Sequence, residues 1–387
     1  MPLSENRVII ACAGSGKTTR LVSESLENRD RRIAIITYTN NNTREISERF
    51  GKRNSGVPKH VDVMTWFGFL LRECARPYQR SKYAEKRIES LLFVNQQSAR
   101  YVKEADTGRY YFANGELIYS DKIAKFVVEC EEKSARSVTK RLAQIYTDVF
   151  IDEFQDLAGW DLEVVRVFLQ SGIRVTLVGD PRQHIYSTNP TSKNRHYLGT
   201  KVMELVEQWM RTGLCSVKCM SDTHRCNGAI CDFSNALWPG MDEMTAVPNR
   251  VTEHDGVFLV GEKHMAEYMR RFNPQVLRYG RRTNTYGYEA LNFGLAKGLQ
   301  FERVLIVPTS AIRQYLQSGE LNHIEKSREK LYVAVTRARH SVAFVYEGQS
   351  EIVPTRWEPI QPGHERAGRT PDLPADVPEL PRAARNG

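Results

Sequence analysis

The chain has 387 residues, of which 41% are hydrophobic and 26% charged, so it is long enough for two or three domains with sizeable cores. It contains no apolar run of membrane-spanning length, no signal-peptide pattern at its N-terminus and only seven cysteines, so we expect a cytoplasmic protein without membrane contact. The formal net charge of +9 indicates a polyanionic partner but does not define a fold.

The first predicted elements are a strand at 8–10, the turn ACAGSGKTTR at 11–20 and a helix that continues from it. A strand, a glycine-rich turn and a helix are the context of a phosphate-binding loop, although the usual first glycine is replaced by Ala11. Lys17 is placed to reach the β and γ phosphates of a nucleoside triphosphate, and the Thr18 hydroxyl to bind Mg²⁺. The predicted phosphate-binding residues are Ala13, Gly14, Ser15, Gly16, Lys17, Thr18 and Thr19.

A second predicted strand, Val149–Ile151, is followed by the carboxylates Asp152, Glu153 and Asp156. Taken alone, this acidic segment would be interpreted as a polar loop. Beside a phosphate-binding loop, a carboxylate at the end of a second strand binds Mg²⁺, which is the role we predict for Asp152. Glu153 would then act as the general base that activates water. Roughly 20 residues later another apolar run ends, and Gln183 follows it. We predict that Gln183 senses the γ-phosphate or orients water.

Further motifs occur in a fixed order along residues 8 to about 346, and together they resemble superfamily I helicases of the UvrD/Rep/PcrA group. AGSGKTT (13–19) and DEFQD (152–156) resemble the two nucleotide motifs of that family. The other segments with this resemblance are ITYTNNNTREISERF (36–50), VMTWFGFLLR (63–72), GDPRQHIY (179–186), THRCNGAI (223–230), LAKGLQFERVLIV (295–307) and EKLYVAVTRARHSV (329–342).

The resemblance implies an α/β fold with two RecA-like parallel-sheet lobes. ATP and Mg²⁺ would lie in the cleft between the lobes, and single-stranded DNA, or DNA with single-stranded regions, would lie across them. We expect the ATP-binding first lobe at 1–213, with a small, mostly helical insertion at about 76–145. The second lobe is expected at 214–347, and a proline-rich, disordered tail at 348–387.

The resemblance also assigns residues of the second lobe to the nucleotide. Arg337 resembles the family's arginine finger and Arg225 its partner, and guanidinium groups from one lobe complete such a site only when the cleft closes. His224 stands where relatives stack a tyrosine on adenine, and Gln300 replaces a glutamate near the ribose. The predicted catalytic set is therefore Lys17, Asp152, Glu153, Gln183, Arg225 and Arg337.

DNA contacts are implied by the same motifs. Tyr38 occupies the position of an aromatic residue that stacks on bases in relatives, and stacking suits binding without sequence preference. The insertion at 76–145 contains fourteen Lys or Arg against nine Asp or Glu, with tyrosines between them, so it contacts DNA or packs its own small core. The predicted DNA-binding residues are Tyr38, Asn40, Thr65, Trp66, Tyr186 and Lys297.

Several departures from the family bear on function. Few residues precede the phosphate-binding loop, so the upstream glutamine motif that recognises adenine is missing from this sequence. Gly294 replaces a histidine, and no Trp-Arg pair follows Tyr186. Only 72 residues separate Arg225 from Lys297, too few for the family's large second accessory domain. These departures predict weak discrimination between bases and poor strand separation.

Three functions remain open from the sequence. The first is an ATP-hydrolysing DNA helicase or translocase, moving 3′-to-5′ by family resemblance. The second is an ATP- and DNA-responsive regulatory or recruiting subunit for a nuclease partner, as in nuclease-associated phage-defence systems such as Gabija or in mobile elements. The third is a P-loop kinase, against which DEFQD and the helix before Arg337 argue. Separately, the cysteines between Cys215 and Cys231 are interpreted either as a zinc site or as core residues.

Overall fold

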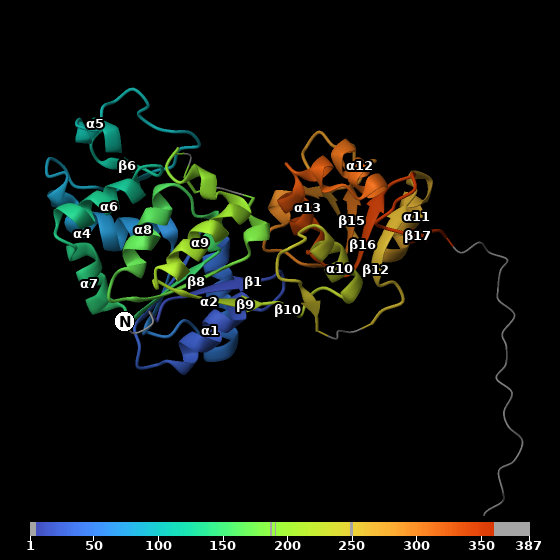
Figure 1. Cartoon of the computed structure of the whole chain (residues 1–387), viewed down its shortest axis with the longest axis horizontal. Helices are drawn as coiled ribbons and strands as arrows, with labels where there is room; N and C mark the ends of the chain where they lie inside the picture. Colours follow the sequence, from blue (N-terminus) through green and yellow to red (C-terminus); the bar gives the residue numbers. More distant parts are fainter. Residues whose placement is uncertain (1–4, 186–187, 190, 248–250, 360–387) are drawn as a thin grey trace, which may run out of the picture.

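The computed structural model describes residues 5–185, 188–189, 191–247 and 251–359. Two bodies lie side by side, and each is built around a six-stranded sheet flanked by helices (Figure 1). All strand neighbours within these two sheets are parallel. The α/β class with two parallel-sheet lobes, which the sequence predicted, is thereby confirmed. We call the body containing the first sheet lobe 1 and the other body lobe 2.

The sheet of lobe 1 places its most apolar strands in the centre. Buried runs such as Val149–Ile151 are typical of parallel strands that are covered on both faces. In spatial order, its strands are β3 (Val61–Thr65), β2 (Ile33–Thr37), β7 (Asp148–Asp152), β8 (Arg174–Gly179), β1 (Arg7–Ala11) and β9 (Ser216–Met220).

Strand β9 corrects the expected division of the chain. We expected lobe 2 to begin at residue 214, but Ser216–Met220 pairs with β1 as the edge strand of the first sheet. The chain leaves this sheet only after Met220, and we propose the boundary between the lobes there. A short exposed edge strand carries no long apolar run, which is why the sequence pattern did not assign it.

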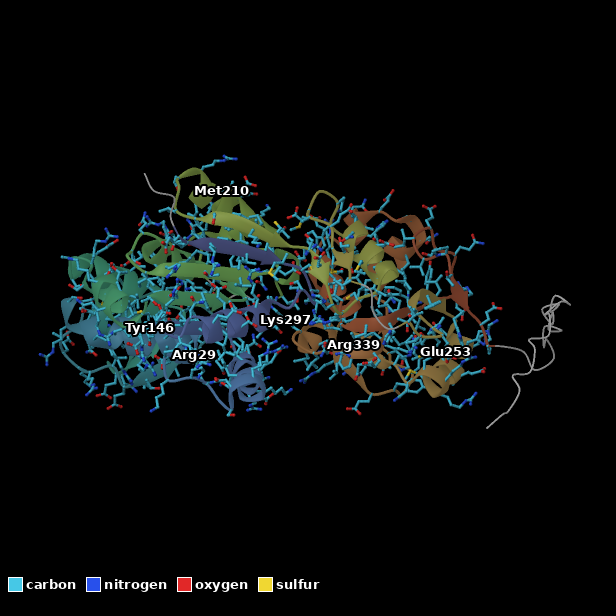
Figure 2. The ribbon with its side chains drawn as sticks, turned by 90° about the horizontal axis from the view of Figure 1, so that it is seen from below. Arg29, Tyr146, Met210, Glu253, Lys297 and Arg339 are labelled. Carbon is cyan, nitrogen blue, oxygen red and sulfur yellow. The ribbon has the colours of Figure 1, made fainter. Side chains whose placement is uncertain are left out.

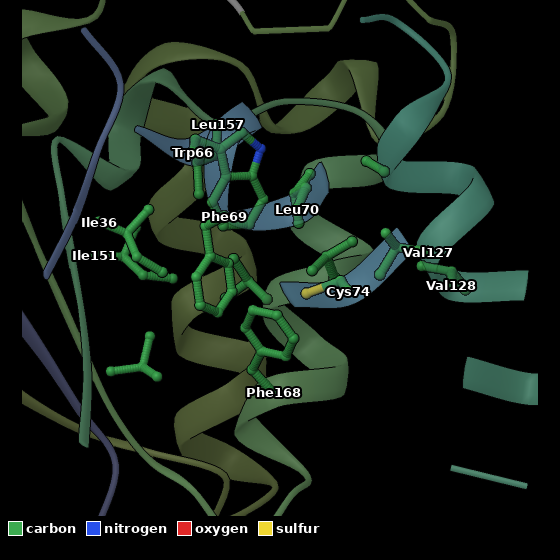
Figure 3. Close-up of a cluster of buried hydrophobic side chains, with 14 of the residues drawn as sticks. Ile36, Trp66, Phe69, Leu70, Cys74, Val127, Val128, Ile151, Leu157 and Phe168 are labelled. Atoms are coloured by element: carbon green, nitrogen blue, oxygen red, sulfur yellow. The ribbon is translucent and has the colours of Figure 1, made fainter. Parts of the chain in front are cut away.

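Successive strand residues point to opposite faces of the sheet, and this alternation builds two cores in lobe 1. On one face, Ile35 and Phe150 pack with Phe50 of α2. On the other face, Ile36 packs in a larger cluster that contains Trp66 and extends along α8 (Figure 3). The helices around this sheet are α1 (Lys17–Glu27), α2 (Asn40–Asn54), α3 (Trp66–Phe69), the π-helix Leu70–Ala75, α8 (Trp160–Leu169) and α9 (Val202–Arg211).

The insertion at 76–145 contains helices and also a small three-stranded sheet that the sequence did not indicate. Tyr83 and Tyr111 are buried, and the Tyr83 ring stacks on Phe112 at 4.5 Å between centroids, so these tyrosines pack the core of the insertion. Tyr101, by contrast, is exposed. The elements are α4 (Arg76–Tyr78), β4 (Ser90–Leu92), α5 (Thr107–Tyr111), β5 (Phe112–Ala113), β6 (Leu117–Tyr119), α6 (Ile123–Lys133) and α7 (Ser137–Ile145).

Lobe 2 repeats the layered arrangement. Its sheet runs β14 (Ala290–Asn292), β13 (Gln275–Arg278), β15 (Phe301–Val307), β16 (Ala338–Val345), β12 (Gly256–Val260) and β17 (Arg356–Trp357). The helices are α10 (Gly228–Ala236), α11 (Met265–Phe272), α12 (Ser310–Ser318) and α13 (Arg328–Val335), and a two-stranded sheet joins β10 (Asp222–Thr223) to β11 (Thr245–Ala246). No helix of the described residues is long and apolar enough to cross a membrane.

The end of lobe 2 corrects a second boundary. We expected a disordered tail from residue 348, but Arg356–Trp357 pairs with β12, and Val353 and Trp357 are buried. Two apolar side chains set among prolines give no periodic signal, yet they are enough to fix a two-residue edge strand. The expected tail beyond residue 359 lies outside the described residues.

Candidate nucleotide-binding and catalytic site

The site begins where three neighbouring strands of lobe 1 end. Strands β7, β8 and β1 are adjacent, so the segments that follow them meet at one edge of the sheet, where open α/β sheets bind ligands. The phosphate-binding loop follows β1, Asp152 ends β7, and Gln183 follows β8. These residues, predicted from separate motifs, are therefore brought to the same edge.

The phosphate-binding loop uses its two glycines differently. Gly16 has a φ of 79° and precedes α1, and a Cβ there would meet no atom within 4 Å, so the backbone faces open space. Gly14 also has a φ of 79°, but a Cβ there would lie 2.4 Å from Thr223 Oγ1 and 2.6 Å from Arg225 Cβ. Gly14 is thus required for the close approach of the segment after β9, and its carbonyl accepts a 3.0 Å hydrogen bond from the His224 N–H.

The central charged group is Glu153. Its carboxylate lies 3.1 Å from Lys17 Nζ and 3.5 Å from Lys297 Nζ, and Lys297 also lies 2.6 Å from Asp156 Oδ2. Lys297 comes from lobe 2, at the junction of the two lobes (Figure 2). The predicted general base is therefore held between two ammonium groups, one from each lobe.

Burial and charge separate the acidities of the adjacent carboxyl groups. Burial, followed by the negative charge of Glu153, raises the pKa of Asp152 to about 7. Burial opposes ionisation of Glu153 as well, but Lys17 and Lys297 outweigh it and hold the pKa of Glu153 below its ordinary value. Glu153 also has a φ of 56°, a left-handed conformation that is uncommon for a non-glycine residue and costs conformational energy.

A buried network joins the third strand end to lobe 2. Asp180 accepts hydrogen bonds from Gln183 Nε2 at 2.9 Å and from the Tyr332 hydroxyl at 2.9 Å, and it pairs with Arg182 at 2.8 Å. The sequence did not assign Asp180 or Tyr332 to the nucleotide site. The only available signal was the position of Asp180 directly after a strand, inside the GDPRQ segment.

The two predicted arginines of lobe 2 reach the same cleft. Arg337 is 2% exposed and donates from Nη2 to Gln183 Oε1 at 3.1 Å. Burial, followed by the nearby Arg225 charge, lowers its pKa to about 9. Arg225 donates from Nη1 to the Thr336 carbonyl at 3.0 Å, and its buried Nε has no hydrogen-bond partner among the described residues. Within that same part of the chain, neither guanidinium forms an ion pair with a carboxylate, so both are available to an anionic ligand.

A cavity of about 100 Å³ unites these groups. Since pockets that enclose whole small molecules have roughly 300–1,000 Å³, this one matches the phosphate end of a nucleotide only. The Ser15 hydroxyl beside it is buried and makes no hydrogen bond to any residue that the structure describes. The cavity is lined by Ala13, Gly14, Gly16, Lys17, Thr18, Thr19, Glu45, Arg49, Glu153, Gln183, Arg225, Gly298 and Arg337.

The donors present fit Mg²⁺ bound together with phosphate. Thr18 offers a hydroxyl and Asp152 a buried carboxylate, which are oxygen ligands of the kind that Mg²⁺ prefers. The described residues contain no group of three or more His, Cys, Asp or Glu placed to hold a metal ion, which removes support for a zinc site at 215–231. Of its cysteines, Cys215, Cys226 and Cys231 are buried, as core residues are.

Of the two residues predicted to bind the base and the ribose of the nucleotide, one lines a cavity and the other does not. His224 is exposed, lies outside the cavity lining and contacts the loop through its backbone, and its stacking role stays a prediction. Gln300 is exposed and lines a second cavity beside Thr19.

Two predicted DNA contacts require correction. Trp66 is 1% exposed and donates from Nε1 to Asp161 at 2.9 Å, so it is a core residue that cannot stack on a base. The ammonium of Lys297 pairs with the carboxylates of the cleft, which attract it away from the outer surface.

The other predicted DNA contacts have varied surroundings. Tyr38 is half-buried beside Phe67, with 6.0 Å between ring centroids, and Asn40 is exposed at the start of α2. Thr65 is half-buried, and its hydroxyl accepts a hydrogen bond from the Gly68 N–H. Tyr186 lies outside the described residues.

Comparisons with known proteins agree with this architecture. Residues 3–189 match the AAA domain family, and residues 125–346, more than half of the chain, match the viral superfamily 1 RNA helicase core domain. The Gabija protein GajB of Bacillus cereus (strain VD045) is 30% identical over 191 residues, which cover 47% of this chain and 38% of that protein.

Two solved structures of arterivirus nonstructural protein 10 (helicase), one of them a complex with DNA, are each 16% identical to this chain. Their TM-scores are 0.44 and 0.46, and the alignments cover 89% and 90% of this chain. They also cover 60% and 62% of the helicase chains, so the chain spans less than two thirds of the length of these relatives.

Proposed function

Because the chain belongs to the family of viral superfamily 1 RNA helicase core domains, we propose that it is an ATP-hydrolysing motor. In this proposal it is a DNA helicase or translocase of the UvrD/Rep/PcrA group that moves 3′-to-5′ on single-stranded DNA. One observation carries the proposal: the buried Arg337 of lobe 2 contacts Gln183 of lobe 1 beside the phosphate-binding loop. A nucleotide in this cavity would touch both lobes, so its hydrolysis would change how they are held together.

The predicted catalytic residues each have a place in hydrolysis. Lys17 would bind the β and γ phosphates, Thr18 and Asp152 would hold Mg²⁺, and Glu153 would accept the proton of the attacking water. When bound, Mg²⁺ would neutralise part of the negative charge of the phosphates. Arg225 and Arg337 stabilise the negative charge that develops on the transferred phosphoryl group.

Single-stranded DNA would cross the edge of lobe 1 that holds Tyr38 and Asn40. The Tyr38 ring lies beside Phe67, and Phe67 lies beside Phe93 of the insertion, with 5.5 Å between ring centroids. Phe93 is 69% exposed, so this row of rings ends at the surface. Exposed rings stack on bases of any sequence, which suits a motor that moves along DNA.

The decisive experiment measures ATP turnover without nucleic acid, with single-stranded DNA and with single-stranded RNA of the same sequence. We expect DNA to stimulate turnover, because a strand bound across both lobes would help to hold Arg225 and Arg337 against the nucleotide. Lys17→Ala should lose nucleotide binding. Equal turnover in all three conditions would contradict a nucleic-acid motor, and stimulation by RNA alone would correct the substrate.

The DNA contacts are tested by comparing two aromatic residues of lobe 1. Tyr38→Ala should weaken binding of single-stranded DNA by about 1–3 kcal/mol, the usual contribution of a stacked base. Trp66→Phe should leave this affinity unchanged, because Trp66 is buried. The reverse pattern in a fluorescence anisotropy titration would place DNA on another surface.

A second candidate function is a regulatory or recruiting subunit that responds to ATP and DNA on behalf of a nuclease partner in antiviral defence. The 30% identity to the Gabija protein GajB favours it, as does the shortness of the segment between Arg225 and Lys297. Directional movement on a labelled single strand by the protein alone would support the motor. DNA-stimulated turnover without movement or unwinding would support the subunit.

A further inference from the structure

A group of lysines lies where the insertion meets the body of lobe 1. The segment that follows β8 runs beside the insertion (Figure 1), and Asn189 Nδ2 donates to the Asp121 carbonyl at 3.3 Å. The residue directly before Trp160 packs against Asn189. The ammonium groups of Lys125 and Lys193 lie 5.2 and 5.4 Å from the centre of the half-buried Trp160 ring. Two distant parts of the chain therefore direct positive charge at one ring.

A second ring extends this group. Lys122 is only 3% exposed, and its ammonium lies 3.8 Å from the centre of the Tyr110 ring, while Lys125 lies 5.2 Å from the same centre. Lys122 forms no ion pair with any residue that the structure describes. The three lysines thus share two rings. We call Lys122, Lys125, Lys193, Tyr110 and Trp160 the lysine–ring cluster.

The cluster keeps its positive charge. A ring attracts a cation through its quadrupole but carries no net charge, so it positions an ammonium group without neutralising it. Two of the three lysines also pair with carboxylates, those of Glu104 and Glu163, and the third does not. Arg195 follows Lys193 in the same segment, is exposed and forms no ion pair within the described part of the chain. Positive charge is therefore in excess at this surface, which attracts an anion.

The cluster adjoins the row of rings that ends at Phe93. The residue after Phe93 donates its N–H to the Ser120 hydroxyl at 3.1 Å. Ser98 donates from its N–H and its hydroxyl to the Asp121 carboxylate, at 2.9 and 2.6 Å. The segment that carries Phe93 is therefore fastened to the residues directly before Lys122. A strand that stacks on the exposed Phe93 ring would meet the cluster next.

We propose that the lysine–ring cluster and Arg195 bind the phosphate backbone of a single strand whose bases stack on the row of rings. This inference rests on the proposed function and identifies where the strand continues beyond the stacking residues. The surface contacts phosphates and does not read bases. Phosphate contacts release counterions, so the logarithm of the affinity falls with the logarithm of the salt concentration, by about 0.7 for each phosphate contacted on a single strand.

The test measures this salt dependence for a variant that lacks two charges. Fluorescence anisotropy with a labelled oligothymidylate, at several salt concentrations, would compare the wild type with the double variant Lys193→Gln and Arg195→Gln. Both side chains lie at the surface, so the fold should be kept. The slope should become shallower by about 1 to 1.5, the value for two phosphate contacts. An unchanged slope would overturn the proposal.

Two further double variants test whether position or charge alone matters. Arg211→Gln with Lys218→Gln removes the same charge from exposed residues at the β9 edge of the sheet, whereas Tyr38 follows β2 near the other edge. This variant should keep the wild-type slope. Lys193→Arg with Arg195→Lys exchanges the two cations and should also keep it. An equal loss of slope at the β9 edge, or a loss in the exchange variant, would overturn the proposal.

The outcome can be told apart from failure of the proposed function. If the wild type binds no single strand and no nucleic acid stimulates turnover, the proposed function and this inference fail together. If the wild type binds, and Tyr38→Ala weakens binding while the variant of Lys193 and Arg195 keeps the wild-type slope, only the phosphate surface is wrong. Thermal melting of each variant confirms that it is folded.

Discussion

The two lobes bring opposite charges to the cleft. Lobe 1 contributes the buried carboxylates Asp152 and Asp156 and the half-buried Glu153, whereas lobe 2 contributes Lys297 and the cavity arginines Arg225 and Arg337. Buried like charges raise the free energy of each lobe by itself, and contact between the lobes compensates them. The difference teaches that the site belongs to the pair of lobes and is incomplete in either one.

The same comparison explains how a nucleotide would change the contact. Lys17 and Lys297 both hold Glu153. Phosphate oxygens would compete with Glu153 for Lys17 and would occupy the unpaired guanidinium groups of lobe 2. The nucleotide would then supply part of the negative charge that lobe 1 now supplies alone.

Removing the central carboxylate of lobe 1 should have the largest effect. Glu153→Gln keeps the shape of the side chain but cannot accept a proton, so DNA-stimulated turnover should fall by roughly 10²–10⁴-fold. ATP affinity should remain, because Lys17 loses its competitor for phosphate. Turnover and equilibrium binding of ATP are the two measurements. Wild-type-like turnover would remove the assignment of Glu153 as general base.

The second prediction removes a positive charge from the lobe 2 side of the cleft. Arg337→Ala should lower turnover by roughly 10²–10³-fold, the usual effect of losing a group that stabilises transition-state charge. The matched control is Arg339→Ala, because Arg339 lies two residues further on and pairs with Glu302 of its own lobe. A similar loss of turnover in both variants would show that positive charge on lobe 2, rather than the position of Arg337, matters.

A variant of Lys297 tests the contact between the lobes, because this residue of lobe 2 pairs with carboxylates of lobe 1. Lys297→Ala removes one of the two charges that lower the pKa of Glu153, and a base with a higher pKa accepts protons more readily. We expect DNA-free turnover to rise roughly 3- to 10-fold, a change on the order of 1 kcal/mol, because the Arg337–Gln183 and Tyr332–Asp180 contacts still join the lobes. Lys330→Ala, which alters a lobe 2 lysine beside Tyr279, is the control. A fall in turnover would show instead that Lys297 takes part in catalysis.

The sequence predicted the parts of this site that follow directly after strands. Lys17, Asp152 and Gln183 each occur just beyond an apolar run, and parallel strands bring such positions to one edge. Trp66 and Lys297 could not be placed this way, since their partners Asp161 and Asp156 are distant in the chain. A motif indicates that a lysine meets an anion, but it does not say whether the anion is a phosphate or a carboxylate.

Asp161 sharpens the comparison through stability instead of turnover, because it is a buried carboxylate of lobe 1 that no cation of lobe 2 reaches among the described residues. Burial raises its pKa to about 6, against opposing hydrogen bonds from Thr188 and Trp66. A raised pKa in the folded state means stability that is present below pH 4 and is lost as the pH rises through about 6.

Asp161→Asn should therefore become more stable relative to the wild type, by on the order of 2–3 kcal/mol, between pH 4 and pH 7. Glu163→Gln on the same helix is the matched control, since burial is outweighed there by Asn194 and Arg166 and the pKa of Glu163 is lowered. The Glu163 carboxylate stabilises the fold above its unfolded pKa, and this stabilisation is lost as the pH falls. The differences in the free energy of unfolding between each variant and the wild type should therefore have opposite pH trends. Urea unfolding at four or five pH values measures both trends. A flat difference for Asp161→Asn would mean that Asp161 stays ionised in the fold without a cation beside it.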